Sequence, residues 1–212
     1  AGLAAPRCLA IDPAGEQCGT PALLMTRLTG AQPTASTGRT ARFADQLAAS
    51  VRAMHERVTV PVGLPDYERW FDPDDLRPPE QTARPWVWER MFEVVTRPTP
   101  APDPPAFIHR DYHAGNTLWS GFRMTGIVDW TTASAGPVGV DLGHMRVNLV
   151  VTGWRELADA YLHAYAALAG PAFVHEPFWD LTSVVDFGPY DGFSPTEIER
   201  MEDYAEELLS ML

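Results

Sequence analysis

Apolar residues recur at the three- and four-residue spacing of an amphipathic helix in several stretches of this chain. The first stretch predicts a helix over residues 42–58. Its apolar face consists of Phe43, Leu47, Val51 and Met54. His55 lies beside that face, and we expect it to have a core or capping role rather than a ligand role.

Four further helices are predicted, over residues 86–96, 142–151 and 154–168 and from residue 195 onward. Asp141 is placed to cap the helix that follows it, and Gly170-Pro171 ends the third. The expected inner faces comprise Trp86, Met91, Val94 and Val95, then Leu157, Tyr161, Tyr165 and Leu168, and finally Ile198, Met201, Ala205, Leu208 and Leu209. The last helix has the strongest start signal, because Ser194, Pro195 and Glu197 together predict a capping box.

Short apolar runs bounded by glycine and proline predict strands. Residues 8–11 and 22–28 are predicted to pair around the turn at 12–15. The proline-rich segments 30–40 and 97–105 are predicted connections.

A second hairpin is predicted in the middle of the chain. Residues 107–108 enter a polar loop at 109–116, a strand follows at 117–119, and another at 126–129 ends in a carboxylate. Small hairpins among helices predict an α+β fold that is mostly α-helical.

The composition is that of a globular protein, with 45% hydrophobic and 21% charged residues among 212. The formal net charge is −12 and no basic patch is visible, so nucleic acid is not an expected partner. Neither a run of about 18 apolar residues nor a signal peptide is visible, so we expect a cytoplasmic protein without a membrane partner. Two cysteines, Cys8 and Cys18, are expected to be reduced structural thiols.

The acidity is concentrated in residues 171–212, which contain ten acids and a single base, Arg200. One interpretation is a solvated helix face. The other is a wall that attracts a cationic substrate. The sequence leaves both interpretations open.

The central hairpin carries residues suited to phosphoryl transfer. His109, Arg110, Asp111 and Asn116 form the pattern H-R-D-x-x-x-x-N, the spacing of the protein-kinase catalytic loop. In this arrangement Asp111 approaches the acceptor hydroxyl and Asn116 points back at a metal ion. Asp129, across one hairpin, supplies the second metal ligand. Phosphoryl transfer needs mainly positioning and charge stabilisation, which such a loop can provide.

Three segments together resemble the aminoglycoside phosphotransferase family, which is related to protein kinases and choline kinases. They are HRDYHAGN, GIVDW and GPVGVDLGHMR. The resemblance implies a kinase-like C-terminal lobe with Asp111 as catalytic base and with Asn116 and Asp129 as Mg2+ ligands. It also implies supporting roles for His109, Arg110 and Asp141: His109 supports the loop, Arg110 forms an ion pair, and Asp141 buttresses the loop from behind.

The segment PALLMTRLTG resembles the strand and hinge that hold the adenine of ATP in that family. The resemblance implies that Met25 lines the pocket and that the backbone of Thr26 and Leu28 bonds the base. Leu118 and Val128 would form the pocket floor.

One departure from the family pattern concerns the phosphate-binding parts. All sixteen basic residues are arginine, and no G-x-G-x-x-G is present. We therefore interpret residues 1–30 as a remnant of the N-terminal lobe and residues 31–212 as the C-terminal lobe with its helical substrate region. The expectation is weak nucleotide binding and little turnover by this chain alone, with an exposed lobe-facing surface that favours a homodimer.

The acceptor is expected to be a small molecule with a hydroxyl group, such as an aminoglycoside or a related antibiotic or metabolite. Asp186 and Asp191 are candidates for an acidic acceptor wall; the alternative is a polar loop between helices. Asp186-Phe187-Gly188 spells the kinase metal motif, but it lies too far from Asp111 for a hairpin partner.

Two alternatives to an active phosphotransferase follow from the same residues. His109, Asp111 and His113 alternate as H-x-D-x-H, which suits a metal-dependent hydrolase. A non-catalytic, pseudokinase-like remnant that binds or dimerises is the other alternative.

Overall fold

The computed structural model describes residues 4–34, 41–100, 104–188 and 190–212. The predicted connections at 30–40 and 97–105 therefore lie partly outside the described residues.

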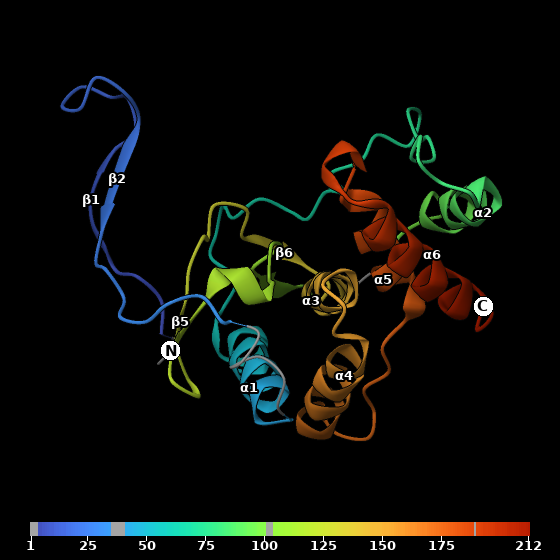
Figure 1. Ribbon diagram of the computed structural model, residues 1–212. Helices are drawn as coiled ribbons and strands as arrows, with labels where there is room; N and C mark the ends of the chain where they lie inside the picture. The colour runs from blue at the N-terminus through green and yellow to red at the C-terminus, as the bar shows by residue number, and fades with distance from the viewer. Residues whose placement is uncertain (1–3, 35–40, 101–103, 189) are drawn as a thin grey trace.

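The described residues form six α-helices, and one of them, α3 (Gly139–Val151), is buried among the others, as Figure 1 shows. The others are α1 (Ala41–Arg57), α2 (Pro85–Val95), α4 (Arg155–Ala169), α5 (Pro177–Asp186) and α6 (Pro195–Leu209). The helix α3 packs against α4, α5 and α6, and α1 packs against α4. The predicted α+β fold with mostly helical content is confirmed.

The start of α6 follows the predicted capping box. Ser194 Oγ accepts the N–H of Glu197 at 3.4 Å, and Glu197 Oε2 accepts the N–H of Ser194 at 2.8 Å. Pro195 occupies the first turn, where its missing N–H has no partner to lose.

The strands form three two-stranded antiparallel sheets. They pair as β1 (Cys8–Asp12) with β2 (Ala22–Met25), β3 (Ala106–Ile108) with β6 (Ser134–Gly136), and β4 (Thr117–Ser120) with β5 (Arg123–Ile127). The strand β6 was not predicted, because three small residues carry no alternation of apolar and polar positions. It pairs with β3 and thereby places the catalytic loop beside α3.

The strand β2 ends three residues earlier than predicted. After it, the Leu28 side chain covers Gly126 in β5, where an added Cβ would lie 2.3 Å from Leu28 Cδ1. The hairpin β1–β2 extends away from the helices (Figure 1), and its large apolar side chains are exposed. Cys8 and Cys18 are both free, as expected of reduced thiols, and both are exposed.

Asp141 does not cap a helix as predicted. The helix α3 begins at Gly139, two residues before Asp141. Asp141 therefore lies inside the first turn, where it is fully buried. Its carboxylate contacts the catalytic loop and not the end of the helix.

The helix α5 was not predicted. It lies directly on α3, because a Cβ at Gly143 would lie 2.4 Å from the Trp179 carbonyl oxygen. Trp86 and Leu168, expected on inner faces, are 58% and 52% exposed. In α2 the neighbouring Trp88 is buried instead.

None of the helices in the described ranges combines the length and apolar character needed to cross a membrane.

Candidate active site

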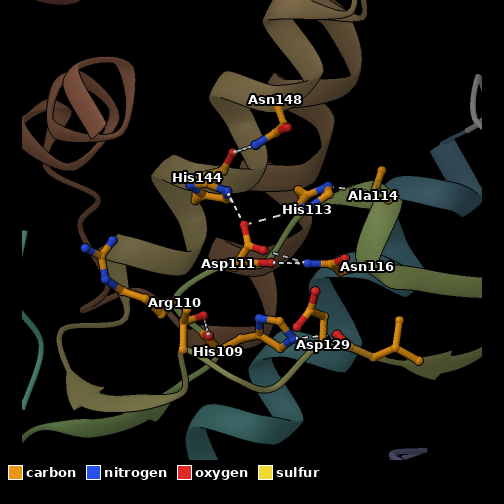
Figure 2. Close-up of polar contacts among 12 residues, drawn as sticks. His109, Arg110, Asp111, His113, Ala114, Asn116, Asp129, His144 and Asn148 are labelled. Carbon is orange, nitrogen blue, oxygen red and sulfur yellow. Dashed lines mark hydrogen bonds and ion pairs between the residues drawn. The ribbon is translucent and has the colours of Figure 1, made fainter. Parts of the chain in front are cut away.

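The polar loop between β3 and β4 turns Asp111 toward α3 (Figure 2). Residues Ala114–Asn116 form one 3-10 turn, which His113 starts by accepting the Gly115 N–H on Nδ1 at 3.1 Å. The turn reverses the chain, so Asn116 Nδ2 donates to the Asp111 Oδ2 at 2.9 Å and to its backbone oxygen at 3.0 Å. The sequence spacing of Asp111 and Asn116 therefore corresponds to one tight turn.

Asp141 anchors this loop from below. Its carboxylate accepts the backbone N–H groups of His109 at 3.0 Å and Arg110 at 2.8 Å. It also accepts His55 Nε2–H at 2.9 Å, and the other ring nitrogen of His55 lies 2.8 Å from the Tyr165 hydroxyl. Burial would raise the pKa of Asp141, but the hydrogen bond and charge of His55 hold that pKa below its ordinary value. Asp141 thus joins α1, α3 and the loop as an ionised, fully bonded group.

His109 is completely buried between the loop and the end of β5. Its Nε2–H donates to the Val128 carbonyl at 2.9 Å, and its ring lies 4.6 Å from the Trp130 ring, centre to centre. The Nδ1 atom is buried without a hydrogen-bond partner among the described residues. The ring therefore holds the backbone of Val128, the residue that directly precedes Asp129.

Arg110 adopts a left-handed backbone conformation, with φ at 75°. Its guanidinium is buried, pairs with Asp186 at 3.1 Å, and lies over the rings of Tyr67 and Trp70 at 4.6 and 3.9 Å. Asp186 also accepts the backbone N–H groups of Trp70 and Phe71. The carboxylate of Asp186 is therefore largely buried and paired with Arg110, and the residue also lines the pocket that contains Asp191.

Asp129 follows β5 with φ at 63°, and its carboxylate is exposed. Oδ1 accepts the Thr131 hydroxyl at 2.9 Å. Asp129 lines a largely apolar pocket of about 490 Å3 together with Met25, Phe107 and Trp130. The structure thus brings one predicted metal ligand and one predicted nucleotide-binding residue to the same pocket.

Asn116 and Asp129 offer oxygen atoms suited to magnesium. Because Asn116 uses its amide nitrogen on Asp111, its Oδ1 is left as an acceptor. Magnesium is commonly held by one or two such oxygens, completed by substrate phosphates and water. The residues present fit that ion.

A metal-dependent hydrolase does not fit the described residues. No three His, Cys, Asp or Glu side chains among them converge to hold a metal. The His109 ring faces Val128 rather than Asp111, so the hypothesis built on His109, Asp111 and His113 is wrong.

The other predicted nucleotide residues are only partly grouped. Thr26 uses its backbone N–H and its hydroxyl on Arg7, at 2.9 and 2.8 Å, so that N–H is already engaged. Leu28 packs on Gly126, the cross-strand partner of Leu118. Val128 donates its N–H to the Asn116 carbonyl at 2.9 Å, which ties the floor of the predicted pocket to the catalytic loop.

Asp191 lies in the 3-10 turn Tyr190–Gly192. It is exposed and lines a second pocket of about 390 Å3 with Asp72, Asp75 and Glu80. Asp186 lines the same pocket, so the structure brings the two candidates for an acidic acceptor wall together.

His144 is a residue of the site that the sequence-based predictions omitted. Its Nε2 lies 2.9 Å from Asp111 Oδ1, and its side chain is only 5% exposed. Burial would raise the pKa of Asp111, but the hydrogen bond and charge of His144, with His113 and Asn116, hold that pKa below its ordinary value. The signal was present, because His144 follows Asp141 by three residues and therefore shares its helix face.

A family comparison covers most of the chain. Residues 1–177 of the 212 match the Phosphotransferase enzyme family (APH). No curated protein matches the sequence.

Several solved structures share the fold at low sequence identity. An aminoglycoside phosphotransferase, APH(4)-Ia, bound to ADP and hygromycin B, superposes with a TM-score of 0.66 at 14% identity over 99% of this chain and 78% of that one. A putative aminoglycoside phosphotransferase from Ralstonia eutropha gives 0.65 at 15% identity over 96% and 78%. An amicoumacin kinase bound to AMP-PNP, Ca2+ and its antibiotic gives 0.63 at 13% identity over 99% and 73%.

At such low sequence identity, the structural similarity shows only that the chain has a kinase-like fold. The family match, in contrast, spans well over half of the sequence. The resemblance expected from HRDYHAGN, GIVDW and GPVGVDLGHMR is confirmed. The chain belongs to the phosphotransferase enzyme family.

Proposed function

We propose that this chain transfers the γ-phosphoryl group of ATP to a hydroxyl group of a small molecule, with Asp111 orienting that hydroxyl. The observation that carries the proposal is the state of Asp111. Its carboxylate is 28% exposed, while Asn116 bonds one of its oxygens and Asp141 anchors the loop that carries it. To orient an incoming hydroxyl group, a carboxylate must be fixed by hydrogen bonds and must also be accessible to the acceptor.

The low pKa of Asp111 makes it ionised at neutral pH and a weak base. We infer that it chiefly orients the acceptor O–H group and receives its proton late, as bonding to phosphorus develops. A magnesium-bound nucleotide supplies the phosphoryl group and neutralises its charge when bound. Asn116 and Asp129 are the residues that would hold the ion, and Met25, with Phe107 and Trp130, offers the adenine an apolar surface.

We propose a cationic acceptor, of which aminoglycosides are the leading class. The acidic pocket beside Asp191 and the net charge of −12 favour a positively charged ligand. The similar structure APH(4)-Ia binds hygromycin B, which supports the same class.

The test is phosphoryl transfer from MgATP to hygromycin B, choline and homoserine, followed by 31P NMR of the product. Asp111→Asn should lower kcat by about 100- to 10,000-fold while MgATP affinity stays nearly unchanged. Asp45→Asn, on the exposed face of α1, is the matched control and should keep wild-type kcat. An active Asp111→Asn variant would contradict the assigned role.

A binding or dimerising protein is the second candidate. The hairpin β1–β2 exposes Leu9, Ile11, Leu23, Leu24 and Met25, each at least 45% exposed. Such a surface favours association with another protein surface. Light scattering beside an MgATP titration separates the candidates, because a monomer that binds MgATP tightly argues against this one.

A further inference from the structure

The Asp111 carboxylate is held at both oxygens, and the two hydrogen bonds come from different parts of the fold. Asn116, on the loop itself, donates to Oδ2 at 2.9 Å. His144, on the first turns of α3, contacts Oδ1 at 2.9 Å through Nε2 (Figure 2). The loop contact alone would leave Oδ1 to be positioned by solvent.

The direction of the His144 hydrogen bond follows from the chemistry of its partner. An aspartate carboxylate is ionised at neutral pH, because its ordinary pKa is about 3.9. An ionised carboxylate can only accept hydrogen bonds. The Nε2 atom of His144 must therefore carry the proton.

His113 is the other imidazole near Asp111, and it cannot replace His144. Its Nε2 lies 3.7 Å from Asp111 Oδ1, which is too long for a hydrogen bond. Its Nδ1 already accepts the Gly115 N–H. His113 therefore contributes to the turn, while His144 contributes to the carboxylate.

The surroundings of His144 restrict its ring. The whole residue is 4% exposed. The rings of Trp70 and Phe187 lie nearly perpendicular to the imidazole ring, with their centres 5.8 and 5.4 Å from its centre. Trp70 also covers the Arg110 guanidinium, 3.9 Å from its ring centre. Trp70 thus packs against both the His144 ring and the Arg110 guanidinium.

We propose that His144 is a positioning residue for Asp111: its Nε2–H fixes Oδ1 so that the carboxylate meets the acceptor hydroxyl in a single orientation. The inference rests on the proposed phosphotransferase function. It predicts that the donor atom matters and the imidazole ring itself does not. Glutamine can place an amide N–H near the Nε2 position, whereas leucine cannot donate.

The kinetic test uses His144→Gln and His144→Leu in the full chain, with MgATP and hygromycin B as substrates and with MgATP and water alone. We expect kcat to fall about 100-fold in His144→Leu, the scale of a 1 Å misplacement, with the KM for MgATP within about twofold. His144→Gln should recover most of the loss. The exposed His163→Gln is the matched control and should match wild type. Wild-type kcat in His144→Leu, or equal losses in both variants, would overturn the proposal.

A second readout does not depend on turnover. Nitrogen-15 NMR of the histidine rings should show a protonated Nε2 at His144, and Asp111→Ala should shift that resonance but not that of His163. If wild type transfers no phosphate to any acceptor, the proposed function fails, while this spectrum still decides whether His144 holds Asp111. An unprotonated Nε2, or a resonance that ignores Asp111→Ala, would refute the contact.

Discussion

The catalytic loop and the β1–β2 hairpin each include a short connection between two strands, and the chain supports them in opposite ways. Around the loop, His109 and Arg110 are buried at 0% and 3% exposure, whereas Ile11 and Leu23 on the hairpin are 66% and 53% exposed. The loop is held by α1, α3 and α5. Contacts inside this chain therefore fix the geometry of the site, while the described residues leave the apolar hairpin uncovered.

Backbone strain follows the same division. The hairpin places glycines, Gly15 and Gly19, where φ is positive, at 72° and 75°. In the site, Arg110 and Asp129 adopt a positive φ instead. For a residue with a Cβ, this backbone conformation costs about 1–3 kcal/mol of conformational energy. Only a region with many buried contacts can retain such residues, so the strain marks the loop as functionally constrained.

Each region also contains an aspartate that accepts three hydrogen bonds, which gives the largest test of the comparison. Asp141→Ala should lower the free energy of unfolding by about 3–5 kcal/mol, because two loop N–H groups and His55 lose a buried acceptor. Urea denaturation measures the change. Asp12→Ala removes the acceptor of the Glu16, Gln17 and Cys18 N–H groups and is the matched control. Since Asp12 lies on the hairpin, which extends away from the helices, its loss should hardly alter global stability. Equal losses of unfolding free energy in the two variants would show that the loop and the hairpin contribute alike to stability.

Within the site, burial should separate two aspartates that both resemble the kinase metal motif. Asp186→Ala should lower the unfolding free energy by about 3 kcal/mol, because Arg110 then stays buried without its partner. Asp129→Ala should change it by no more than about 0.5 kcal/mol, since Asp129 is exposed.

Calorimetry with MgATP should show the reverse ranking for these two variants. Asp129→Ala is expected to lose magnesium-dependent binding, and Asp186→Ala to retain it wherever the protein stays folded. Retained magnesium dependence in Asp129→Ala would remove Asp129 from the proposed ion site.

Acid should unfold the protein partly through the loop. The folded-state pKa of Asp141 is lowered from 3.8, so its stabilising effect is complete above that value and is lost as pH falls through the folded pKa. The unfolding free energy should therefore decline below about pH 4. The decline should be shallower in Asp141→Asn than in wild type. Parallel curves would show that Asp141 contributes no pH dependence.

The smallest effect is expected on the hairpin. Ile11→Thr combined with Leu23→Thr should change the monomer's unfolding free energy by no more than about 0.5 kcal/mol. If the hairpin mediates self-association, the same variant should abolish the concentration dependence of the mass measured by light scattering. A large loss of monomer stability would mean that these side chains are buried in solution.

Much of the fold was predictable from local sequence features. The helix α1 and the capping box of α6 follow from periodicity and end signals, and α2 from a proline at its first position. The failures share one cause. The strand β6 and the helix α5 gain their stability from partners distant in sequence, which a local pattern does not report.

The same distinction applies to the candidate site. Asp111 and Asn116 were predictable together, because a tight turn joins residues that are five positions apart. The partnership of Arg110 with Asp186 spans 76 positions, so no local feature of the sequence could predict it.

The family and the spacing of the candidate site residues in the loop could be read from the sequence, because the loop pattern depends on short-range geometry. The inner face of α1 could be read as well, because burial in that helix follows its periodicity. The pairing of buried charges became visible only with the packing of the helices: Asp141 pairs with His55 and the loop, Arg110 with Asp186, and His144 with Asp111. Buried charges require partners, and the partner of each is chosen by how helices distant in sequence pack around α3.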